Sequence, residues 1–416
     1  MLSAGLWLPA MGSVINVVGV GADGWRGLSG RSRQLVEAAD VLVGGKRHLA
    51  MPPATQAILE PWPTPLLERL PGLFERYDGR RIVVLASGDP LLSGIGTTLV
   101  DLLGADRVEV VPSVSSVSLA RARMNWSAES TDVVTVVGRD HDVVRRYVSP
   151  GRRLIVLSSD GKTPAVVAEL LVEVGFGAST LTVLSDLGAD DERRVEHRAS
   201  APVGADAPAL NVVCVECRPD SPDVTLLSTV PGLPDDAFEH DGQLTKRDLR
   251  ASALSRLLPL PGQLLWDVGA GAGSVAIEWM RADPRCRAVA VEADADRAGR
   301  IRRNAGRLGV PTLDVRHTSA PEGLTDLPAP DAVFVGGGAS RSGVLDACWD
   351  ALAPGGRMVV HAVTLETEAM VLDRYRSRGG ELTRLSVERA SAIGTFTGWT
   401  PARAIVQWAV TKKGEA

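Results

Sequence analysis

Short apolar segments that alternate with amphipathic ones constrain this chain of 416 residues more than any other feature. Runs such as IVVLAS at 82–87, LIVLSS at 154–159 and AVAVE at 288–292 have the length and composition of buried strands. Several runs end in glycine or a polar turn, and helical patterns such as TPAVVAELL at 163–171 lie between them. This order predicts an α/β fold whose strands are mostly buried.

The composition of the sequence changes over residues 218–240. This stretch is rich in Pro, Asp and Ser and has little hydrophobic periodicity, which is typical of a linker. At about 150 residues per domain, the length suggests two to three domains. We expect an N-terminal extension at 1–13, a first α/β domain at 14–217, a linker at 218–240 and a second α/β domain at 241–412.

Charge and hydropathy exclude several classes of protein. The 45 basic and 50 acidic residues give a formal net charge of −5, which disfavours a protein that wraps nucleic acid. No apolar run approaches membrane length, and the opening residues MLSAGLWLPAM lack the basic start of a signal peptide. We expect a cytoplasmic protein that begins at Met1 or Met11, with no membrane and no nucleic acid as partner.

Cysteine and histidine spacing indicates no metal centre. Cys214 and Cys217 form a C-x-x-C motif, but they lie in the apolar run LNVVCVEC, away from a helix start or a second ligand pair. None of the six histidines has the spacing of a His–His or Cys–His ligand set. We expect structural thiols in a reducing compartment and no bound metal.

The stretch LLWDVGAGAGSVAIEW at 264–279 carries the most information about a ligand. A strand is followed by three glycines at alternate positions and then by a helix: Gly269, Gly271 and Gly273. Glycine lets the chain turn tightly and lets a ligand approach the backbone. Glu292 ends the next predicted strand, nineteen residues after Gly273, where a carboxylate can accept both ribose hydroxyls of an adenosine.

Two adenosine ligands fit this pattern, and phosphate distinguishes them. A dinucleotide site has the order G-x-G-x-x-G and places pyrophosphate on the helix N-terminus. Here the order is G-x-G-x-G, preceded by Asp267, whose carboxylate would repel pyrophosphate but attract the ammonium group of an amino acid. The loop therefore favours S-adenosylmethionine over NAD, while a tight turn without a ligand stays open.

Two further segments of the second domain follow the same predicted sheet edge. Ser319 and Ala320 come after a strand, where they would lie beside an adenine. Gly336 and Gly337 end another strand, where they either contact the substrate or only turn the chain.

The segment TKRDLR, ahead of the glycine turn, permits two interpretations. Thr245 and Asp248 form a capping box, which by itself only begins a helix. The alternative is that Lys246, Arg247 and Arg250 present cations at the mouth of the pocket.

In the first domain, polar loops follow two buried strands. Gly88, Asp89 and Pro90 come directly after IVVLAS, at the carboxyl edge where α/β sheets bind ligands. Ser115 and Ser116 come after a strand and before a helix, where they either hold a carboxylate or cap the helix.

Two glycine-containing turns complete the candidates of the first domain. The turn GVGADG, which contains Gly21, resembles a glycine-turned strand end. Lys46, Arg47 and His48 follow a strand and two glycines, which suits anionic ligand groups as well as an exposed charged run.

These motifs carry a resemblance to known families. VGVGADGW, VGGKRHL, LASGDPLLSGIG, PSVSSVSLA and LNVV together resemble the tetrapyrrole methylases. DGQLTKRDLR, WDVGAGAGSVAIEW, DAVFVGGG and HAVTLETE resemble a class I methyltransferase domain. The resemblance implies a two-lobed tetrapyrrole methylase fold followed by a Rossmann-like fold, with one S-adenosylmethionine site in each domain.

The fusion of the two domains in this order is similar to a bifunctional enzyme family of cobalamin biosynthesis. It implies methylation of the corrinoid precorrin-6B at C-5 by the first domain. It implies methylation at C-15 and loss of the ring C acetate carboxyl as carbon dioxide in the second domain, which gives precorrin-8X. The family further implies a homo-oligomer formed through the C-terminal domain and a hand-off of the product to the next enzyme of the pathway.

The resemblance and the motifs together assign three groups of residues. The candidates for the cofactor are Gly21, Gly88, Asp89, Pro90, Ser115, Ser116, Leu210, Thr245, Asp267, Gly269, Gly271, Gly273, Glu292, Ser319 and Ala320. The candidates for substrate carboxylates are Lys46, Arg47, His48, Lys246, Arg247, Arg250, Gly336 and Gly337. The candidates for catalysis are Thr245, Lys246 and Glu366.

Three alternative functions stay open at this point. A two-domain NAD(P)-dependent oxidoreductase would retain a nicotinamide cofactor. A non-enzymatic carrier of a tetrapyrrole would bind the macrocycle without methyl transfer. An RNA-directed methyltransferase is disfavoured by the acidic charge balance.

Overall fold

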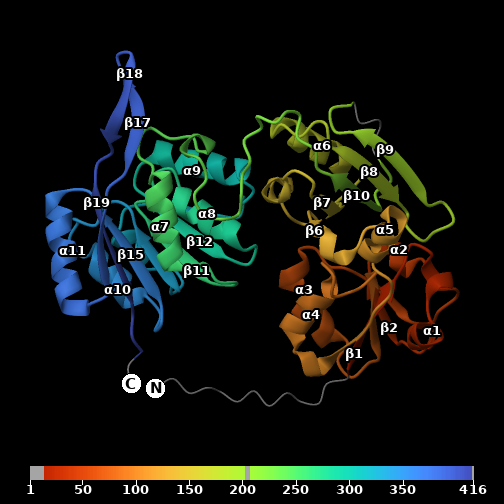
Figure 1. Cartoon of the computed structure of the whole chain (residues 1–416). Helices are drawn as coiled ribbons and strands as arrows, with labels where there is room; N and C mark the ends of the chain where they lie inside the picture. Colours follow the sequence, from red (N-terminus) through yellow and green to blue (C-terminus); the bar gives the residue numbers. More distant parts are fainter. Residues whose placement is uncertain (1–13, 202–206, 415–416) are drawn as a thin grey trace. The chain divides into compact units, whose positions relative to one another are not determined.

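The computed structural model of the chain describes residues 14–201 and 207–414. The chain forms two compact units: the first ends at His141 and resumes over Pro150–Pro222, and the second comprises Asp142–Ser149 and the chain from Asp223 onward (Figure 1). The expected extension, with its candidate start residues, lies outside the described residues. No helix within the described ranges is long and apolar enough to cross a membrane.

The first unit begins with a five-stranded parallel sheet in the order β3-β2-β4-β1-β5. Its strands are β1 (Ile15–Val20), β2 (Val41–Gly44), β3 (Ile58–Pro61), β4 (Ile82–Ser87) and β5 (Val108–Val111). Its helices are α1 (Gly30–Glu37), α2 (Lys46–Leu49), α3 (Leu66–Arg76) and α4 (Ile95–Leu103). Leu70 and Leu99, from α3 and α4, pack on one face of the sheet, and Val36 of α1 packs on the other.

A second five-stranded sheet in the first unit has the order β6-β7-β10-β8-β9. Its strands are β6 (Asp132–Thr135), β7 (Arg153–Leu157), β8 (Thr180–Ser185), β9 (Arg193–Arg198) and β10 (Asn211–Glu216). Only the β6–β7 pair is parallel; the other three pairs are antiparallel. The helices of this part are α5 (Ser116–Met124) and α6 (Thr163–Glu173). Two sheets in one unit confirm the expected two-lobed fold.

The second unit contains a seven-stranded sheet in the order β13-β12-β11-β14-β15-β19-β16. Its strands are β11 (Leu264–Val268), β12 (Arg287–Glu292), β13 (Asp314–His317), β14 (Ala332–Val335), β15 (Arg357–Ala362), β16 (Glu381–Leu385) and β19 (Ile405–Thr411). The first five strands in this order are parallel, and β19 pairs antiparallel with both β15 and β16. This topology confirms the expected Rossmann-like fold.

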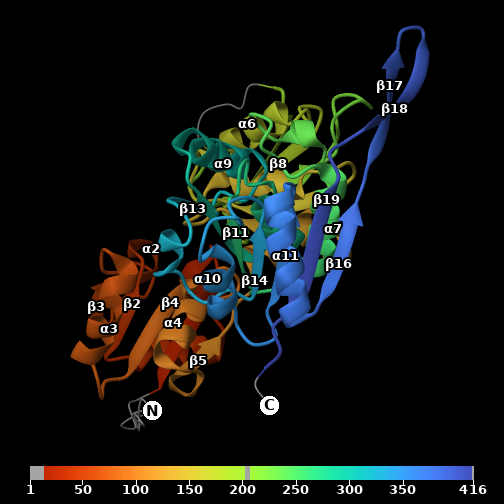
Figure 2. The same ribbon diagram turned by 90° about the vertical axis from the view of Figure 1, so that its left-hand side faces the viewer.

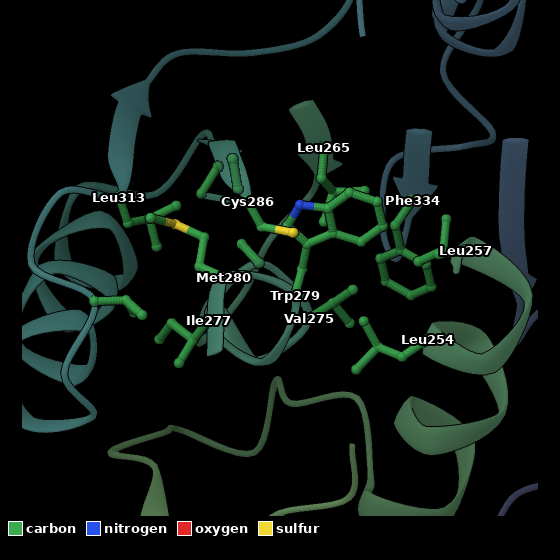
Figure 3. Close-up of a cluster of buried hydrophobic side chains, with 14 of the residues drawn as sticks. Leu254, Leu257, Leu265, Val275, Ile277, Trp279, Met280, Cys286, Leu313 and Phe334 are labelled. Carbon is green, nitrogen blue, oxygen red and sulfur yellow. The ribbon is translucent and has the colours of Figure 1, made fainter. Parts of the chain in front are cut away.

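Helices cover both faces of this sheet (Figure 2). One side carries α7 (Arg247–Leu257), α8 (Ser274–Ala282) and α9 (Ala295–Arg307), and the other carries α10 (Val344–Ala351) and α11 (Leu365–Arg378). On the first side, Leu254 and Leu257 of α7 and Trp279 of α8 pack with Phe334 of β14 (Figure 3). The indole Nε1 of Trp279 donates to the carbonyl oxygen of Arg287 at 3.0 Å, so this large buried ring leaves no polar atom unpaired.

A two-stranded hairpin, β17 (Glu388–Ile393) and β18 (Phe396–Pro401), extends away from the seven-stranded sheet (Figure 2). The sequence motifs did not predict it. Three large apolar side chains of the hairpin are exposed to solvent: Ile393 (61%), Phe396 (79%) and Trp399 (70%).

Part of the predicted linker packs into the second unit. Leu233 and Phe238 are buried among the side chains of α7 and α8. Glu278 accepts hydrogen bonds from the backbone N–H groups of Gly232 at 2.6 Å and Leu233 at 2.9 Å. The buried guanidinium of Arg250 donates to Glu278 at 2.5 Å and to the carbonyl oxygen of Leu233, and it stacks on the ring of Phe238 at 4.8 Å.

Candidate ligand sites and family membership

A cavity of about 540 Å³ opens in the second unit at the carboxyl ends of the central strands. The chain runs outward through β11, β12 and β13 and then returns to form β14 beside β11. The loops after β11 and β14 therefore leave in opposite directions, and open α/β sheets bind ligands in the crevice between such loops. The cavity lies at this switch point, because both loops line it.

The glycine turn after β11 forms one wall of the cavity with bare backbone. Gly269 has a φ of +68°, and a Cβ atom on it would lie 2.5 Å from the carbonyl oxygen of Gly337. Gly271 has a φ of +59°, and its Cβ would lie 2.7 Å from the carbonyl oxygen of Gln243. Only glycine fits both the left-handed backbone and the close contacts.

Glu292 lies where the spacing predicted it, at the end of β12 and on the cavity wall. The side chain is 6% exposed, and its two oxygens accept the backbone N–H groups of Gly271 at 2.8 Å and Asp294 at 3.0 Å. Each carboxylate oxygen can accept a second hydrogen bond. The carboxylate therefore braces the glycine turn and can still receive hydroxyl groups from a ligand.

Asp267 does not line the cavity. Its side chain is 1% exposed, and Oδ2 accepts the backbone N–H of Ala276 at 3.0 Å, in the first turn of α8. Burial, with a smaller contribution from the charge of Glu292, raises the pKa of Asp267 to about 7. The side chain caps the start of α8 through this hydrogen bond. It does not reach the cavity, so the structure does not place it at the ammonium group of a ligand.

Of the other candidates in the second unit, those on the cavity wall are Thr245, Lys246, Gly269, Gly271, Ser319, Ala320, Gly336 and Gly337. Four candidates lie elsewhere. Gly273 begins α8 and packs against Ile301 of α9. Arg247 is exposed in the first turn of α7, Arg250 is buried in the ion pair described above, and Glu366 is exposed in the first turn of α11.

The motifs missed His361, which is the last residue but one of β15 and lines the cavity. Its Nε2 lies 2.9 Å from Oε1 of Gln407, and its ring meets that of Phe334 edge-on, with 4.9 Å between centroids. Burial lowers the pKa of His361 to about 4. The imidazole is therefore neutral at pH 7 and offers no cation to the cavity.

The motifs also missed four arginines of this cavity wall, Arg297, Arg341, Arg389 and Arg403. Arg297 lies in α9 and Arg341 follows β14, whereas Arg389 lies in β17 and Arg403 follows β18. A signal for the hairpin existed, since polar and apolar residues alternate in its strands around Gly394, but nothing in the sequence placed its base at the cavity.

A second cavity, of about 400 Å³, lies within the first unit and is lined from both of its sheets. The candidates that the fold brings together there are Gly21, Arg47, His48, Gly88, Asp89, Ser115, Ser116 and Leu210. Two candidates lie apart: Lys46 is exposed outside the cavity, and Pro90 is buried behind it, against Gly94 and Gly96.

Capping contacts shape the wall that the first sheet contributes. Gly88 has a φ of +55° and donates its N–H to the carbonyl oxygen of Val20 at 2.8 Å, which joins the ends of β4 and β1. Oδ1 of Asp89 accepts the N–H of Leu91 at 2.9 Å. Ser115 is the N-cap of α5, and its Oγ accepts the N–H of Ser118 at 3.1 Å.

Arg47 is the one member of the predicted cation trio that brings a charge to this cavity. Its Nη2 lies 2.9 Å from Nε2 of His48 and 3.2 Å from Oγ of Ser87. Burial and the neighbouring guanidinium lower the pKa of His48 to about 4, so this imidazole accepts the hydrogen bond in its neutral form.

The second sheet adds polar residues that the motifs did not identify, namely Ser158, Ser159 and Asn211. The amide nitrogen of Asn211 donates to the carbonyl oxygens of Asp160 at 3.0 Å and Pro208 at 2.9 Å, and its oxygen accepts Oγ of Ser158 at 2.6 Å. This amide thus holds the loops after β7 and before β10 together at the cavity.

The thiols lie apart from both cavities. All four cysteines are buried and none forms a disulfide, and burial raises the pKa of the Cys214 thiol to about 12. Within 14–201 and 207–414, no group of three or more His, Cys, Asp or Glu side chains is arranged to hold a metal ion.

Comparison with known proteins matches each half of the chain to a family model. The model of tetrapyrrole (corrin/porphyrin) methylases covers residues 14–202, and the model of the precorrin methyltransferase domain covers residues 236–412. A Sinorhizobium protein named precorrin-6Y C(5,15)-methyltransferase [decarboxylating] is 43% identical over 401 residues, which is 96% of each chain.

Two shorter relatives match part of the chain. A cobalt-precorrin-7 C(5)-methyltransferase of Salmonella typhimurium is 31% identical over 180 residues, 43% of this chain and 88% of its own. A probable cobalt-precorrin-6B C(15)-methyltransferase (decarboxylating) of Saccharolobus solfataricus is 33% identical over 144 residues, 33% of this chain and 72% of its own.

All three relatives are methyltransferases, and the alternative of an NAD(P)-dependent oxidoreductase has no support among them. The resemblance that the motifs indicated is confirmed along nearly the whole length. The chain therefore belongs to the family of precorrin-6Y C(5,15)-methyltransferases (decarboxylating).

Proposed function

We propose that the chain is a bifunctional S-adenosylmethionine-dependent enzyme of cobalamin biosynthesis that converts precorrin-6B to precorrin-8X. The first unit methylates C-5, and the second methylates C-15 and decarboxylates the ring C acetate. The observation that carries this proposal is the presence of two separate cavities, one in each unit, each at the carboxyl ends of strands.

The cavity wall of the second unit suits an adenosine that carries no phosphate. Bare backbone at Gly269 and Gly271 lets a ligand approach closely, and Glu292 presents a carboxylate to ribose hydroxyls. The N–H of Gly271 already donates to this carboxylate, so it is not free to hold a phosphate. When S-adenosylmethionine is bound, it supplies a methyl group on a positively charged sulfur for displacement by an electron-rich carbon.

The cavity of the first unit suits the same donor with different groups. The loop of Gly88 and Asp89 and the start of α5 at Ser115 and Ser116 lie on its wall together. Backbone N–H groups at a helix start can hold the carboxylate of the donor's amino-acid part, and Asp89 can receive its ammonium group. A volume of about 400 Å³ lies within the range of small-ligand cavities.

Two shorter relatives support the division of labour between the units. One is named for methylation at C(5) alone, and the other for methylation at C(15) with decarboxylation. The names place the two activities on separate chains in other organisms, which supports a division of the two activities between the two units that the family models match here.

The residues of both units mainly bind and orient. Displacement at a methyl carbon requires the two reacting atoms to be in line at near-attack distance, and such orientation can contribute about 7–11 kcal/mol. In the decarboxylation, the carbon–carboxyl bond breaks, carbon dioxide leaves, the macrocycle takes up the electron pair, and one proton adds to the former methylene. Thr245 and Lys246 line the cavity of the second unit and remain the candidates for contact with the reacting groups, whereas Glu366 does not line it.

Three finer parts of the proposal concern the setting of the enzyme. The exposed apolar side chains Ile393, Phe396 and Trp399 of the hairpin favour a homo-oligomer formed through the second unit. Four buried cysteines, none of which forms a disulfide, suit a reducing compartment such as the cytoplasm. The product would then pass to the next enzyme of the pathway.

Mass spectrometry of the product tests the proposal. After incubation with precorrin-6B and S-adenosylmethionine, we expect a product that has gained two methyl groups and lost one carbon dioxide. Titration with S-adenosylhomocysteine should show two binding sites per chain. A single site, or preferential binding of a nicotinamide coenzyme, would overturn the proposal.

A further inference from the structure

The base of the hairpin forms a wall of the cavity in the second unit. Arg389 lies in β17, and Arg403 follows the end of β18. Between them, the N–H of Ala402 donates to the carbonyl oxygen of Val387 at 2.8 Å and closes the base of the hairpin. All four residues line the cavity, so the base of the hairpin contributes two arginines to its wall, one from β17 and one from the segment after β18.

The strand order divides the lining of this cavity into two halves. Gly271, Glu292 and Ser319 follow β11, β12 and β13, on one side of the switch point. Gly337 and His361, together with the hairpin, belong to β14, β15 and the chain beyond them. The groups suited to the adenosine all lie in the first half, which leaves the second half to the methyl acceptor.

The charges in the acceptor half are mostly positive and weakly compensated. Arg389 pairs with Asp248 at 2.8 Å, but the two side chains are 52% and 53% exposed, and such pairs contribute little. Arg341 pairs with Glu322 at 3.1 Å. Arg403 makes no hydrogen bond or ion pair with any residue in the described part of the chain. A guanidinium without an anion is thus exposed on the wall where the acceptor would lie.

We propose that Arg389 and Arg403 form a clamp for carboxylate side chains at the rim of the macrocycle. This inference rests on the proposed function and names the residues that determine where the acceptor lies in the second unit. The planar fork of arginine matches a carboxylate with two parallel hydrogen bonds. Arg389 can turn one edge toward a substrate carboxylate while its other edge stays with Asp248, because a guanidinium carries five N–H donors.

The clamp holds carboxylates that remain on the product, not the ring C acetate. A guanidinium stabilises the ionised carboxylate that decarboxylation must destroy, so it would raise the barrier to carbon dioxide loss at a carboxylate it binds. Holding the other carboxylates instead fixes the macrocycle with C-15 toward the donor. The two arginines are therefore positioning residues, and their removal should change KM much more than kcat.

Steady-state kinetics of the full-length enzyme test the clamp. The variants are Arg389→Gln, Arg403→Gln and the double variant, with carbon dioxide release and C-15 methylation of precorrin-6B as the readouts. We expect KM to rise about tenfold in each single variant, the effect of losing one hydrogen-bonded charge, and further in the double variant, while kcat stays within about twofold. Arg403→Lys should give an intermediate KM, because the charge remains without the fork.

Internal and matched controls separate the clamp from other effects. C-5 methylation by the first unit and the affinity of the second site for S-adenosylhomocysteine should both stay unchanged. Arg376→Gln, at an exposed position of α11 where the arginine pairs with Asp373, should leave KM unchanged. An unchanged KM in the double variant, or an equal loss of S-adenosylhomocysteine affinity, would overturn the clamp. Failure of the unaltered enzyme to release carbon dioxide would instead overturn the proposed function on which the clamp rests.

Discussion

Gly269 and Gly337 approach so closely that a Cβ atom on the first would lie 2.5 Å from the carbonyl oxygen of the second. The turns after β11 and β14 thus meet through backbone alone at the floor of the cavity. Gly269→Ala forces a left-handed φ of +68° on alanine and drives its methyl group into Gly337. We expect the second unit to lose about 2–4 kcal/mol of unfolding free energy and its S-adenosylhomocysteine site, while the first site persists.

Gly299→Ala is the matched control for this glycine. It lies inside α9, where the nearest atom to a new Cβ is the Arg303 guanidinium at an ordinary 3.5 Å, so alanine should leave stability equal or slightly higher. Two-site calorimetric titration and denaturant unfolding check both variants. Retention of both sites in Gly269→Ala would show that the glycine turn does not form the donor site.

The charge and the bracing contacts of Glu292 can be separated by two substitutions. Glu292→Gln keeps one oxygen acceptor for the N–H of Gly271 but removes the charge, whereas Glu292→Ala removes both. We expect S-adenosylhomocysteine affinity at the second site to fall about tenfold or more in Glu292→Gln and further in Glu292→Ala, with the first site unaffected.

Asp373→Asn, at an exposed position of α11, is the control for Glu292. It removes one negative charge, as Glu292→Gln does, but at a residue that does not line the cavity. Isothermal titration of the three variants provides the comparison. Two-site stoichiometry and affinity identical to the unaltered enzyme in Glu292→Ala would remove this carboxylate from the donor site.

The ion pair of Arg250 with Glu278 should contribute strongly to stability because neither side chain reaches solvent appreciably. Arg250→Met leaves the Glu278 carboxylate buried without its cation, and we expect a loss of about 3–5 kcal/mol in the unfolding of the second unit. Arg256→Met, on the same helix, breaks a pair with the exposed Glu381 and should cost less than about 1 kcal/mol. Equal unfolding midpoints of the two variants in urea would contradict this ranking.

The raised pKa of Asp267 makes the stability of the second unit depend on pH. Its carboxyl titrates at about 7 in the folded state against a usual value of 3.8, so between these values the folded state binds more protons. Stability therefore falls as pH rises from about 4 to 7, by up to about 1.4 kcal/mol for each unit of pKa difference. Asp267→Asn stays neutral and should remove this dependence.

His361 has the opposite effect on the pH dependence of stability. Its folded-state pKa of about 4 lies below the usual 6.5, so between these values the folded state binds fewer protons and the unfolding free energy rises with pH. The test is therefore the difference in unfolding free energy between the unaltered enzyme and Asp267→Asn, measured at pH 5 and pH 7.5. A difference that does not change between these two pH values would show that Asp267 is ionised throughout.

Local pattern predicted the turns of both cavities but not the direction of every side chain. The strand before the glycine turn was expected to point Asp267 at the ligand. In a strand covered on both faces, however, alternate side chains enter opposite layers, and Asp267 lies on the same side as Leu265, under the start of α8. The sequence therefore predicted that Asp267 lies at the end of the strand, but not that its side chain points away from the cavity.

Arg250 shows a signal that was present and not used. It precedes Ala253, Leu254 and Leu257 at helical spacing and so shares their buried face, although the neighbouring cations suggested an exposed cluster. Arg389 and Arg403 could not be found in this way, because the hairpin reaches the cavity through the long-range pairing of β19 with β15 and β16. No local spacing encodes that contact.

The ion pair beneath α7 also determines where the second unit can be cut from the first. A fragment that began at residue 241 would keep all seven strands of its sheet, yet Glu278 would lose the N–H groups of Gly232 and Leu233, and Arg250 would lose the carbonyl oxygen of Leu233. The buried charges of Glu278 and Arg250 would then lack these backbone hydrogen-bond partners. Dissection of the enzyme into independently studied halves therefore has to begin the second half upstream of Gly232, inside the stretch that composition alone marks as a connector.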